Sequence, residues 1–292
     1  MNPSTERKPL PAWARLPIAL LFLIPVFVAQ ILVWRLRSTI GIVATSTLSA
    51  AIASLLGWAV YRLYVLRFER RPVTEFGTPG ALLELSSGLA IGALIFAATM
   101  GVLALMGAYR IAGTGNASLL VVPLAMSIGS GVIEEILFRG VIFRLLEASL
   151  GTWIALTVSA LLFGLGHLLG SRATAQGAIA IIFEAGIMLA AAYLLTRRLW
   201  LPIGIHVGWN FTEGGIFGTS VSGSKTKGLF EGVLTGPDWL SGGSFGPEAS
   251  IVAVVLCVAL GVSLLIAAAR RRRFVSSPWR RDSRSSQPDK AR

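Results

Sequence analysis

Eight apolar runs constrain this chain more than any other feature of its sequence. Each is close to the roughly 20 residues that an α-helix needs to cross the hydrocarbon core of a bilayer. The runs cover residues 16–34, 40–61, 82–109, 118–143, 154–169, 178–195, 201–218 and 250–269. The composition agrees, because 54% of the 292 residues are hydrophobic and only 14% are charged. The sequence therefore predicts an all-α, polytopic membrane protein of about eight transmembrane helices.

The basic residues predict how these helices are oriented. Loops that stay in the cytoplasm carry an excess of Lys and Arg. With both termini in the cytoplasm, 20 of the 26 basic residues fall on the inside. The outside segments hold the other six, which are Arg35, Arg37, Arg110, Arg172, Lys225 and Lys227. We therefore expect a multi-pass protein of the cell membrane with both termini cytoplasmic.

The net charge of +12 does not indicate a nucleic-acid partner. Nine of the basic residues lie in the last 23 residues, after the final apolar run, and none of the runs carries a basic recognition face. A juxtamembrane segment that contacts lipid headgroups explains this distribution more simply. The expected partners are membrane lipids and a membrane-associated protein or peptide, and no nucleic acid.

Composition divides the chain into five parts. Residues 1–117 hold N-terminal transmembrane helices and an interfacial segment at 62–80, and residues 118–214 hold most of the unusual polar groups. Residues 215–249 are expected to be a flexible, Gly- and Ser-rich loop on the non-cytoplasmic side, with a lid over a binding site as the alternative. Residues 250–269 form the last helix, and residues 270–292 a basic, disordered tail.

The fourth run contains two acids and an arginine in the stretch GVIEEILFRGVI, Gly131 to Ile142. Charges inside a membrane helix are costly, so such residues indicate a functional site. A helix turns about 100° per residue, so Glu135 and Arg139, four apart, share a face and are expected to pair. Glu134 points in another direction and needs a partner on another helix.

The only two histidines of the chain lie in later apolar runs and are the expected partners. They are His167, in LLFGLGHLLG, and His206, in LPIGIHVGWNF. Asn210 follows His206 by about one helical turn and faces the same way. We therefore predict that Glu134, His167, His206 and Asn210 converge on one intramembrane site.

Small residues and further acids accompany these groups. Glycines that permit close helix packing occur at Gly129, Gly131, Gly140, Gly164, Gly166, Gly204 and Gly208. Glu213 either borders the proposed site or lies at the edge of its run. Glu84 and Glu184 have no partner that spacing identifies.

Three motifs in this order resemble the intramembrane proteases of the CAAX protease and bacteriocin-processing family, also called CPBP or Abi. They are EExxxR at Glu134, Glu135 and Arg139; FxxxH at Phe163 and His167; and HxxxN at His206 and Asn210. The resemblance covers about residues 121–211. It implies a helical bundle of about eight spans around a polar cavity that faces the cytoplasm.

The resemblance also implies a role for each motif residue. Glu134 and His167 correspond to the pair that activates a water for attack on a peptide carbonyl. His206 and Asn210 correspond to the pair that stabilises the oxyanion, Glu135 and Arg139 are supporting residues, and Phe163 packs beside the site. Glu134, His167 and His206 are also candidate ligands for a divalent metal such as zinc, and the sequence leaves open whether one is bound.

Three functions are compatible with these residues. The first is an intramembrane endopeptidase of the CAAX-protease type, and the motif set favours it. The second is a proton-coupled transporter, since buried Glu and His also form proton relays; the repeated halves common in transporters are not evident in the sequence. The third is a non-catalytic immunity or scaffold protein that retains the motifs.

Overall fold

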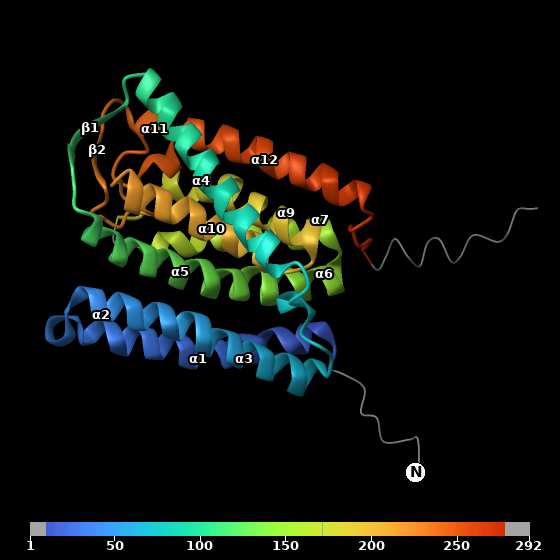
Figure 1. The fold of residues 1–292 in the computed structure, drawn as a ribbon. Coiled ribbons are helices and arrows are strands. Elements are labelled where there is room, and N and C mark those ends of the chain that lie inside the picture. The colour runs from blue at the N-terminus through green and yellow to red at the C-terminus, as the bar shows by residue number, and fades with distance from the viewer. Residues whose placement is uncertain (1–9, 171, 278–292) are drawn as a thin grey trace, which may run out of the picture.

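The computed structural model describes residues 10–170 and 172–277 and shows a bundle of long helices (Figure 1). All eight apolar runs are helical over most of their length. Within the described residues, seven helical stretches are long and apolar enough to cross a membrane. They are residues 14–35, 37–69, 81–105, 117–150, 152–169, 175–196 and 251–270. The predicted all-α, polytopic membrane fold is confirmed, although the seventh run forms a shorter helix.

The helices and strands have the following bounds: α1 Ala12–Arg35, α2 Arg37–Ala51, α3 Gly57–Tyr64, α4 Ala81–Leu105, β1 Tyr109–Thr114, α5 Val121–Glu135, α6 Arg144–Leu150, α7 Thr152–Gly166, α8 Ala175–Ile181, α9 Ile187–Thr196, α10 Trp200–Phe211, β2 Phe230–Leu234, α11 Asp238–Ser241 and α12 Ile251–Arg270. Five π-helical segments continue these helices: η2 Ile52–Leu56, η3 Val65–Glu69, η6 Ile136–Phe143, η8 Ile182–Gly186 and η9 Thr212–Ile216. Short 3₁₀ turns occur at η4 Thr74–Phe76, η5 Ala117–Leu120, η7 His167–Leu169 and η10 Pro247–Ala249.

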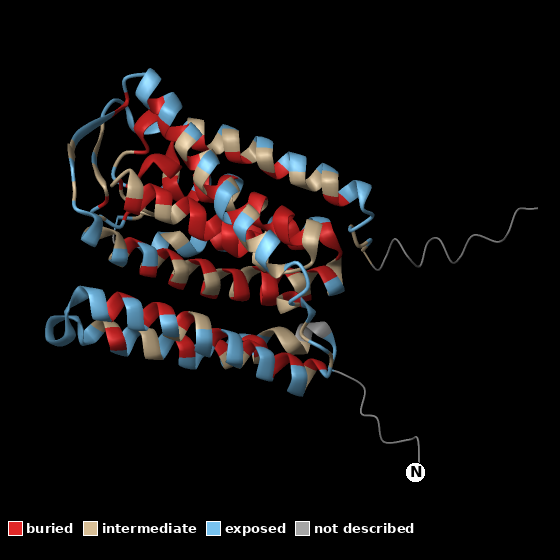
Figure 2. Ribbon diagram, in the orientation of Figure 1, coloured by how far each residue is buried: buried red, intermediate tan, exposed pale blue. Residues whose placement is uncertain are grey.

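Helix α10 lies at the centre of the bundle. It packs against α4, α5 and α9, and every residue from Leu201 to Trp209 is buried. Helices α1, α2 and α3 form a layer beside α5, while α12 covers α9 on the opposite side (Figure 1). Buried residues concentrate around α10, whereas the outer helices expose apolar faces, as a bilayer requires (Figure 2). The helix of the seventh apolar run is thus surrounded by protein.

Glycines bring α4 and α10 into backbone contact. Gly88 and Gly92 on α4 face Gly204 and Gly208 on α10. A Cβ atom added at Gly92 would lie 2.1 Å from the carbonyl oxygen of Ile205, which leaves no room for any side chain. These four positions form two small-xxx-small pairs, the pattern that lets membrane helices approach closely. They fix the position of α10, which carries His206 and Asn210.

Replacing one of these glycines is expected to destabilise the bundle. Gly92→Ala should lower the free energy of unfolding by about 1 to 3 kcal/mol, because overpacking forces the two helices apart. Gly101→Ala, on the same helix, is the matched control, since nothing lies within 4 Å of its added Cβ. Thermal melting of both variants in detergent measures the difference. Equal melting temperatures would contradict the proposed packing.

One end of the bundle differs from the expected flexible loop at 215–249. Strand β2, within this segment, pairs antiparallel with β1, a strand that begins where the third apolar run was expected to end. Phe245 is fully buried and Gly223 N–H donates to its carbonyl oxygen, so the segment folds back onto the helices. The expectation of an exposed loop is therefore wrong for the part of the segment that is buried, which includes residues 245–249. Local composition did not indicate this packing, because the stabilising contacts come from residues that are distant in the sequence.

The opposite end is built from arginines and their partners. Arg144 donates to Glu69, Arg197 pairs with Glu147, and Arg198 pairs with Glu84. The helix expected to end near residue 61 continues to Glu69, so only the remainder of the 62–80 segment is a connection. Of the predicted disordered tail, residues 274 and 275 contact the start of α7, and residues 278–292 lie outside the described part of the chain.

Candidate active site

The EExxxR motif lies where α5 passes into the π-helical segment η6. Glu135 is the last residue of α5, and both Glu135 and Arg139 are completely buried. The Glu134 side chain is 29% exposed and faces a cavity. The two adjacent acids therefore point in different directions, as the helical geometry predicts. π-Helical turns within α-helices are frequently found at functional sites.

Arg139 holds three elements together. Its Nη1 donates to Glu135 Oε1 at 2.7 Å, which is the predicted pair. Its Nη2 donates to the carbonyl oxygen of Ala185 at 2.9 Å, in η8. The guanidinium also stacks over the Phe163 ring of α7, at 4.4 Å from the ring centroid. The sequence did not indicate the contacts to η8, because no local spacing encodes them.

Glu135 also orients His206. The distance between His206 Nδ1 and Glu135 Oε1 is 3.0 Å, and because an ionised carboxylate only accepts, Nδ1 carries the proton. His206 Nε2 then faces Glu134, with 4.0 Å between Nε2 and Oε2. The spacing predicted that Glu135 pairs with Arg139 alone. In the structure, its Oε1 atom accepts hydrogen bonds from both Arg139 and His206. Glu135 is thus a positioning residue for His206.

His167 lies at the end of α7. Its Nδ1 is 2.8 Å from the carbonyl oxygen of Phe163, which can only accept, so Nδ1 is the donor. The Nε2 atom of the neutral ring is therefore left to accept a hydrogen bond. The Phe163 ring centroid lies 5.0 Å from that of His167 and 6.2 Å from that of His206. Phe163 thus packs against both histidines.

The residues predicted to converge on one site lie around a cavity of about 490 Å³. Glu134, His167, His206 and Asn210 all line it. Asn210 Nδ2 donates to Ser130 Oγ at 3.3 Å, and Ser130 lines the same cavity. The lining also includes apolar side chains of α1, α5, η6 and α7, and residues of the segment Val221–Thr226. The structure thus brings together four polar residues from three helices that lie far apart in sequence.

Three buried acids lie behind this cavity. Glu213 Oε2 accepts from Trp209 Nε1 at 3.2 Å, Glu248 Oε1 accepts from Ser222 N at 2.5 Å, and one oxygen of Glu184 has no partner in the described residues. Glu184 and Glu248 line a second cavity of about 20 Å³, shared with both histidines and large enough for one water. Burial raises the pKa of Glu248 above that of an ordinary carboxyl.

The sequence identified these acids only in part. Glu213 was considered a neighbour of the site; it is fully buried and does not line the main cavity. Glu84, by contrast, pairs with Arg198 far from the site. Nothing in the sequence indicated Glu248, which reaches the histidines only because residues 219–249 fold back onto the bundle.

The three candidate metal ligands, Glu134, His167 and His206, line the same cavity. Among the described residues, no three His, Cys, Asp or Glu side chains converge so as to hold a metal ion. The nearest side-chain atoms of Glu134 and His206, Oε2 and Nε2, are 4.0 Å apart.

Residues 116–212 match the model of a protein family described as type II CAAX prenyl endopeptidase Rce1-like. The match confirms the family resemblance that the three motifs predict. It spans about a third of the chain and includes every motif residue from Glu134 to Asn210, but neither Glu213 nor Glu248. At the level of the family, it supports a membrane protease that acts on a protein or peptide. No curated protein matches the chain significantly.

Proposed function

We propose that the chain is an intramembrane endopeptidase that hydrolyses a peptide bond with a water held by Glu134 and His167. One observation carries the proposal: the polar residues of three separate motifs line a single cavity, within a segment that matches an endopeptidase family. The cavity lies inside a bundle whose outer surface suits lipid. It is large enough to hold a short stretch of extended polypeptide.

Glu134 is the proposed general base. Its side chain reaches the cavity and pairs with no arginine of the described residues, in contrast to Glu135. The Glu134 carboxylate would accept a proton from the water as the water oxygen bonds to the carbonyl carbon. The same proton would pass to the leaving nitrogen as the C–N bond breaks. His167, with Nδ1 held by Phe163, would accept a hydrogen bond from this water at Nε2 and so align it.

His206 and Asn210 are the proposed oxyanion donors. The amide Nδ2 of Asn210 and the Nε2 of His206 are presented by successive turns of α10, a helix held rigidly by its neighbours. Glu135 holds Nδ1 of His206 and would stabilise positive charge on the ring while Nε2 donates to the oxyanion. Preorganised donors of this kind stabilise developing charge strongly where water is scarce.

Reconstitution in liposomes tests this function. Wild-type protein and Glu134→Ala are incubated with membrane-associated peptides, and products are identified by mass spectrometry. Cleavage by the wild type alone supports the peptidase. Absence of cleavage together with Glu134-dependent proton flux in the same liposomes would favour a proton-coupled transporter, and absence of both would favour a non-catalytic scaffold.

Removal of metal ions is expected to leave the activity unchanged. The proposed chemistry relies on Glu134, His167, His206 and Asn210 alone, and among the described residues no three His, Cys, Asp or Glu side chains are grouped so as to hold a metal ion. Purified protein is dialysed against a strong chelator, its metal content is measured, and cleavage is compared before and after. Loss of cleavage that returns on adding zinc would contradict this mechanism and assign the water to a metal.

A further inference from the structure

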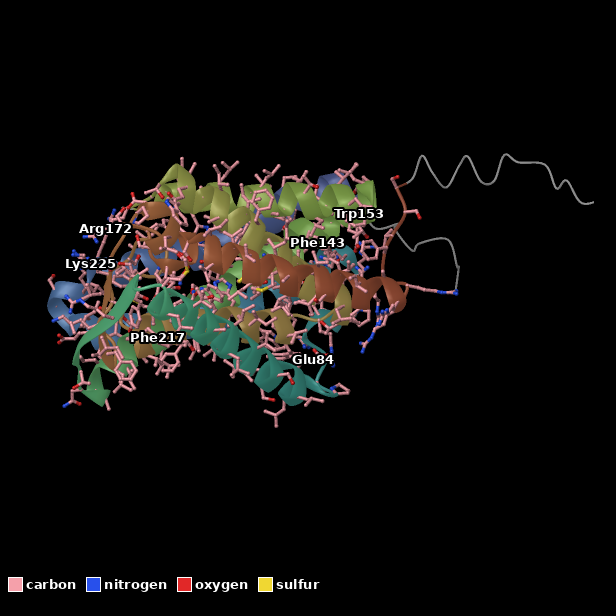
Figure 3. All side chains as sticks on the ribbon, turned by 90° about the horizontal axis from the view of Figure 1, so that it is seen from above. Glu84, Phe143, Trp153, Arg172, Phe217 and Lys225 are labelled. Carbon is pink, nitrogen blue, oxygen red and sulfur yellow. The ribbon has the colours of Figure 1, made fainter. Side chains whose placement is uncertain are left out.

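The bundle has two chemically different ends. The site end comprises β1, β2, α11 and the segment Val221–Thr226, which lines the active-site cavity. The arginine end comprises the connection after α3, the α6–α7 turn, residues 197–199 and the end of α12. Figure 3 shows Arg172 and Lys225 at the site end, and Trp153 and Glu84 at the other. The start of α1 and the end of α12 both lie at the arginine end (Figure 1).

Basic residues are distributed unequally between these ends. The described arginines at the arginine end are Arg15, Arg62, Arg67, Arg70, Arg71, Arg144, Arg197, Arg198, Arg270, Arg271, Arg272 and Arg273. The site end has Arg35, Arg37, Arg110, Arg172, Lys225 and Lys227. Twofold more basic residues therefore lie at the arginine end, in short connections close to the helix ends. These are the connections in which Lys and Arg determine orientation.

The arginines also belong to the folded structure at that end. Arg197 pairs with Glu147 and donates to the carbonyl oxygen of Arg273. Arg198 donates to Glu84 and to the carbonyl oxygen of Gly77. These contacts join α6, the connection at residues 197–199, the start of α4 with the connection before it, and the end of α12. All of these segments must therefore lie on one side of the membrane. The inferred orientation therefore does not depend on the number of basic residues in any single loop.

We propose that the active-site cavity opens on the non-cytoplasmic side of the membrane and takes polypeptide segments exposed on that side. The positive-inside rule places the arginine end in the cytoplasm, and the cavity is lined by Val221, Ser222, Ser224 and Thr226 of the opposite end. The family resemblance implies a cavity that faces the cytoplasm, whereas residues 215–249, several of which line the cavity, are predicted to lie on the non-cytoplasmic side. These two expectations cannot both hold. The distribution of basic residues favours the non-cytoplasmic position.

Cysteine labelling tests the orientation without any measurement of activity. Cys257, the only cysteine, is buried and is replaced by alanine. Single cysteines are then placed at Ser224, exposed beside the cavity, at Lys227, exposed outside the cavity lining, and at Ser276, exposed at the arginine end. A membrane-impermeant maleimide is applied to intact and to permeabilised cells.

Ser224→Cys and Lys227→Cys are expected to label fully in intact cells, and Ser276→Cys at least tenfold more after permeabilisation. The reverse pattern, or all three cysteines on one side, would overturn the proposal. Lys227→Cys keeps the test decisive if the cavity variant fails to accumulate. Ser241, although in the same loop, is buried and would not serve as a probe.

The choice of substrate rests on the proposed peptidase function and needs a second measurement. Sealed membrane vesicles of both orientations are given a water-soluble, quenched fluorescent peptide library. Cleavage that depends on Glu134 is expected in right-side-out vesicles and at least tenfold slower in inside-out vesicles. Faster cleavage in inside-out vesicles would overturn the inference. If neither orientation cleaves, the peptidase function fails, and the labelling pattern still decides the orientation.

Discussion

Glu134→Gln, His167→Ala and His206→Ala are each expected to abolish detectable cleavage while the protein stays folded. Glu134→Gln removes the proposed base, and a positioned acid or base contributes about 10² to 10⁴ in rate. His206→Ala removes an oxyanion donor, which typically costs about 10² to 10³. All three side chains line the same cavity, so each loss affects the same reacting atoms. Cleavage rates in liposomes and thermal melting in detergent measure the two parts of this prediction.

Glu231→Gln is the matched control for the change at Glu134. Glu231 is an exposed acid on β2 and does not line the cavity, so its loss of charge should leave cleavage at the wild-type rate. Full activity in a folded variant at Glu134, His167 or His206 would remove that residue from the mechanism.

Glu135→Ala and Arg139→Ala are expected to destabilise the protein by about 3 to 5 kcal/mol each, because either change leaves a buried charge uncompensated. Both side chains are fully buried and joined at 2.7 Å. Arg139→Ala also removes donors from the carbonyl oxygens of Ala185 and Gly186. Replacing both residues together, with Glu135→Gln and Arg139→Gln, should restore part of the loss. Unfolding in detergent, followed for the single and double variants, measures the coupling.

The Glu84 and Arg198 pair provides the comparison for this prediction. Both side chains are partly exposed, at 19% and 22%, so Glu84→Ala should cost no more than about 1 kcal/mol. Glu134→Gln should leave stability unchanged or raise it, because no arginine depends on that acid in the described structure. If Glu134→Gln were the destabilising change and Glu135→Ala melted like the wild type, the roles of the two acids would be reversed.

The sequence predicted the helical part of the fold and the four polar residues that line the main cavity. Long apolar runs determine membrane helices directly, because an unpaired backbone is not tolerated in lipid. The i to i+4 spacing similarly predicted that Glu135 and Arg139 pair, and that Glu134 faces elsewhere. The convergence of His167, His206 and Asn210 was predicted from the rarity of polar groups inside apolar runs. These features depend on local periodicity or on the cost of burying charge.

Other features depend on contacts between distant segments, and the sequence did not predict them. The pairing of β1 with β2 joins residues more than a hundred positions apart, and composition alone gave a loop in its place. The contact of Glu135 with His206 and the approach of Glu248 to the histidines likewise arise only from tertiary packing. The central position of α10 follows from its glycine contacts with α4, which apolar runs alone do not reveal.

Hydrolysis in ¹⁸O-labelled water by purified protein in liposomes tests the central claim most directly. The wild-type protein should release a product whose new C-terminal carboxyl carries one ¹⁸O atom, since the water held by Glu134 and His167 supplies that oxygen. Glu134→Gln, at equal amounts of folded protein, should release none. Absence of labelled product from the wild type, or equal release by Glu134→Gln, would contradict the assignment of this cavity as a peptidase site.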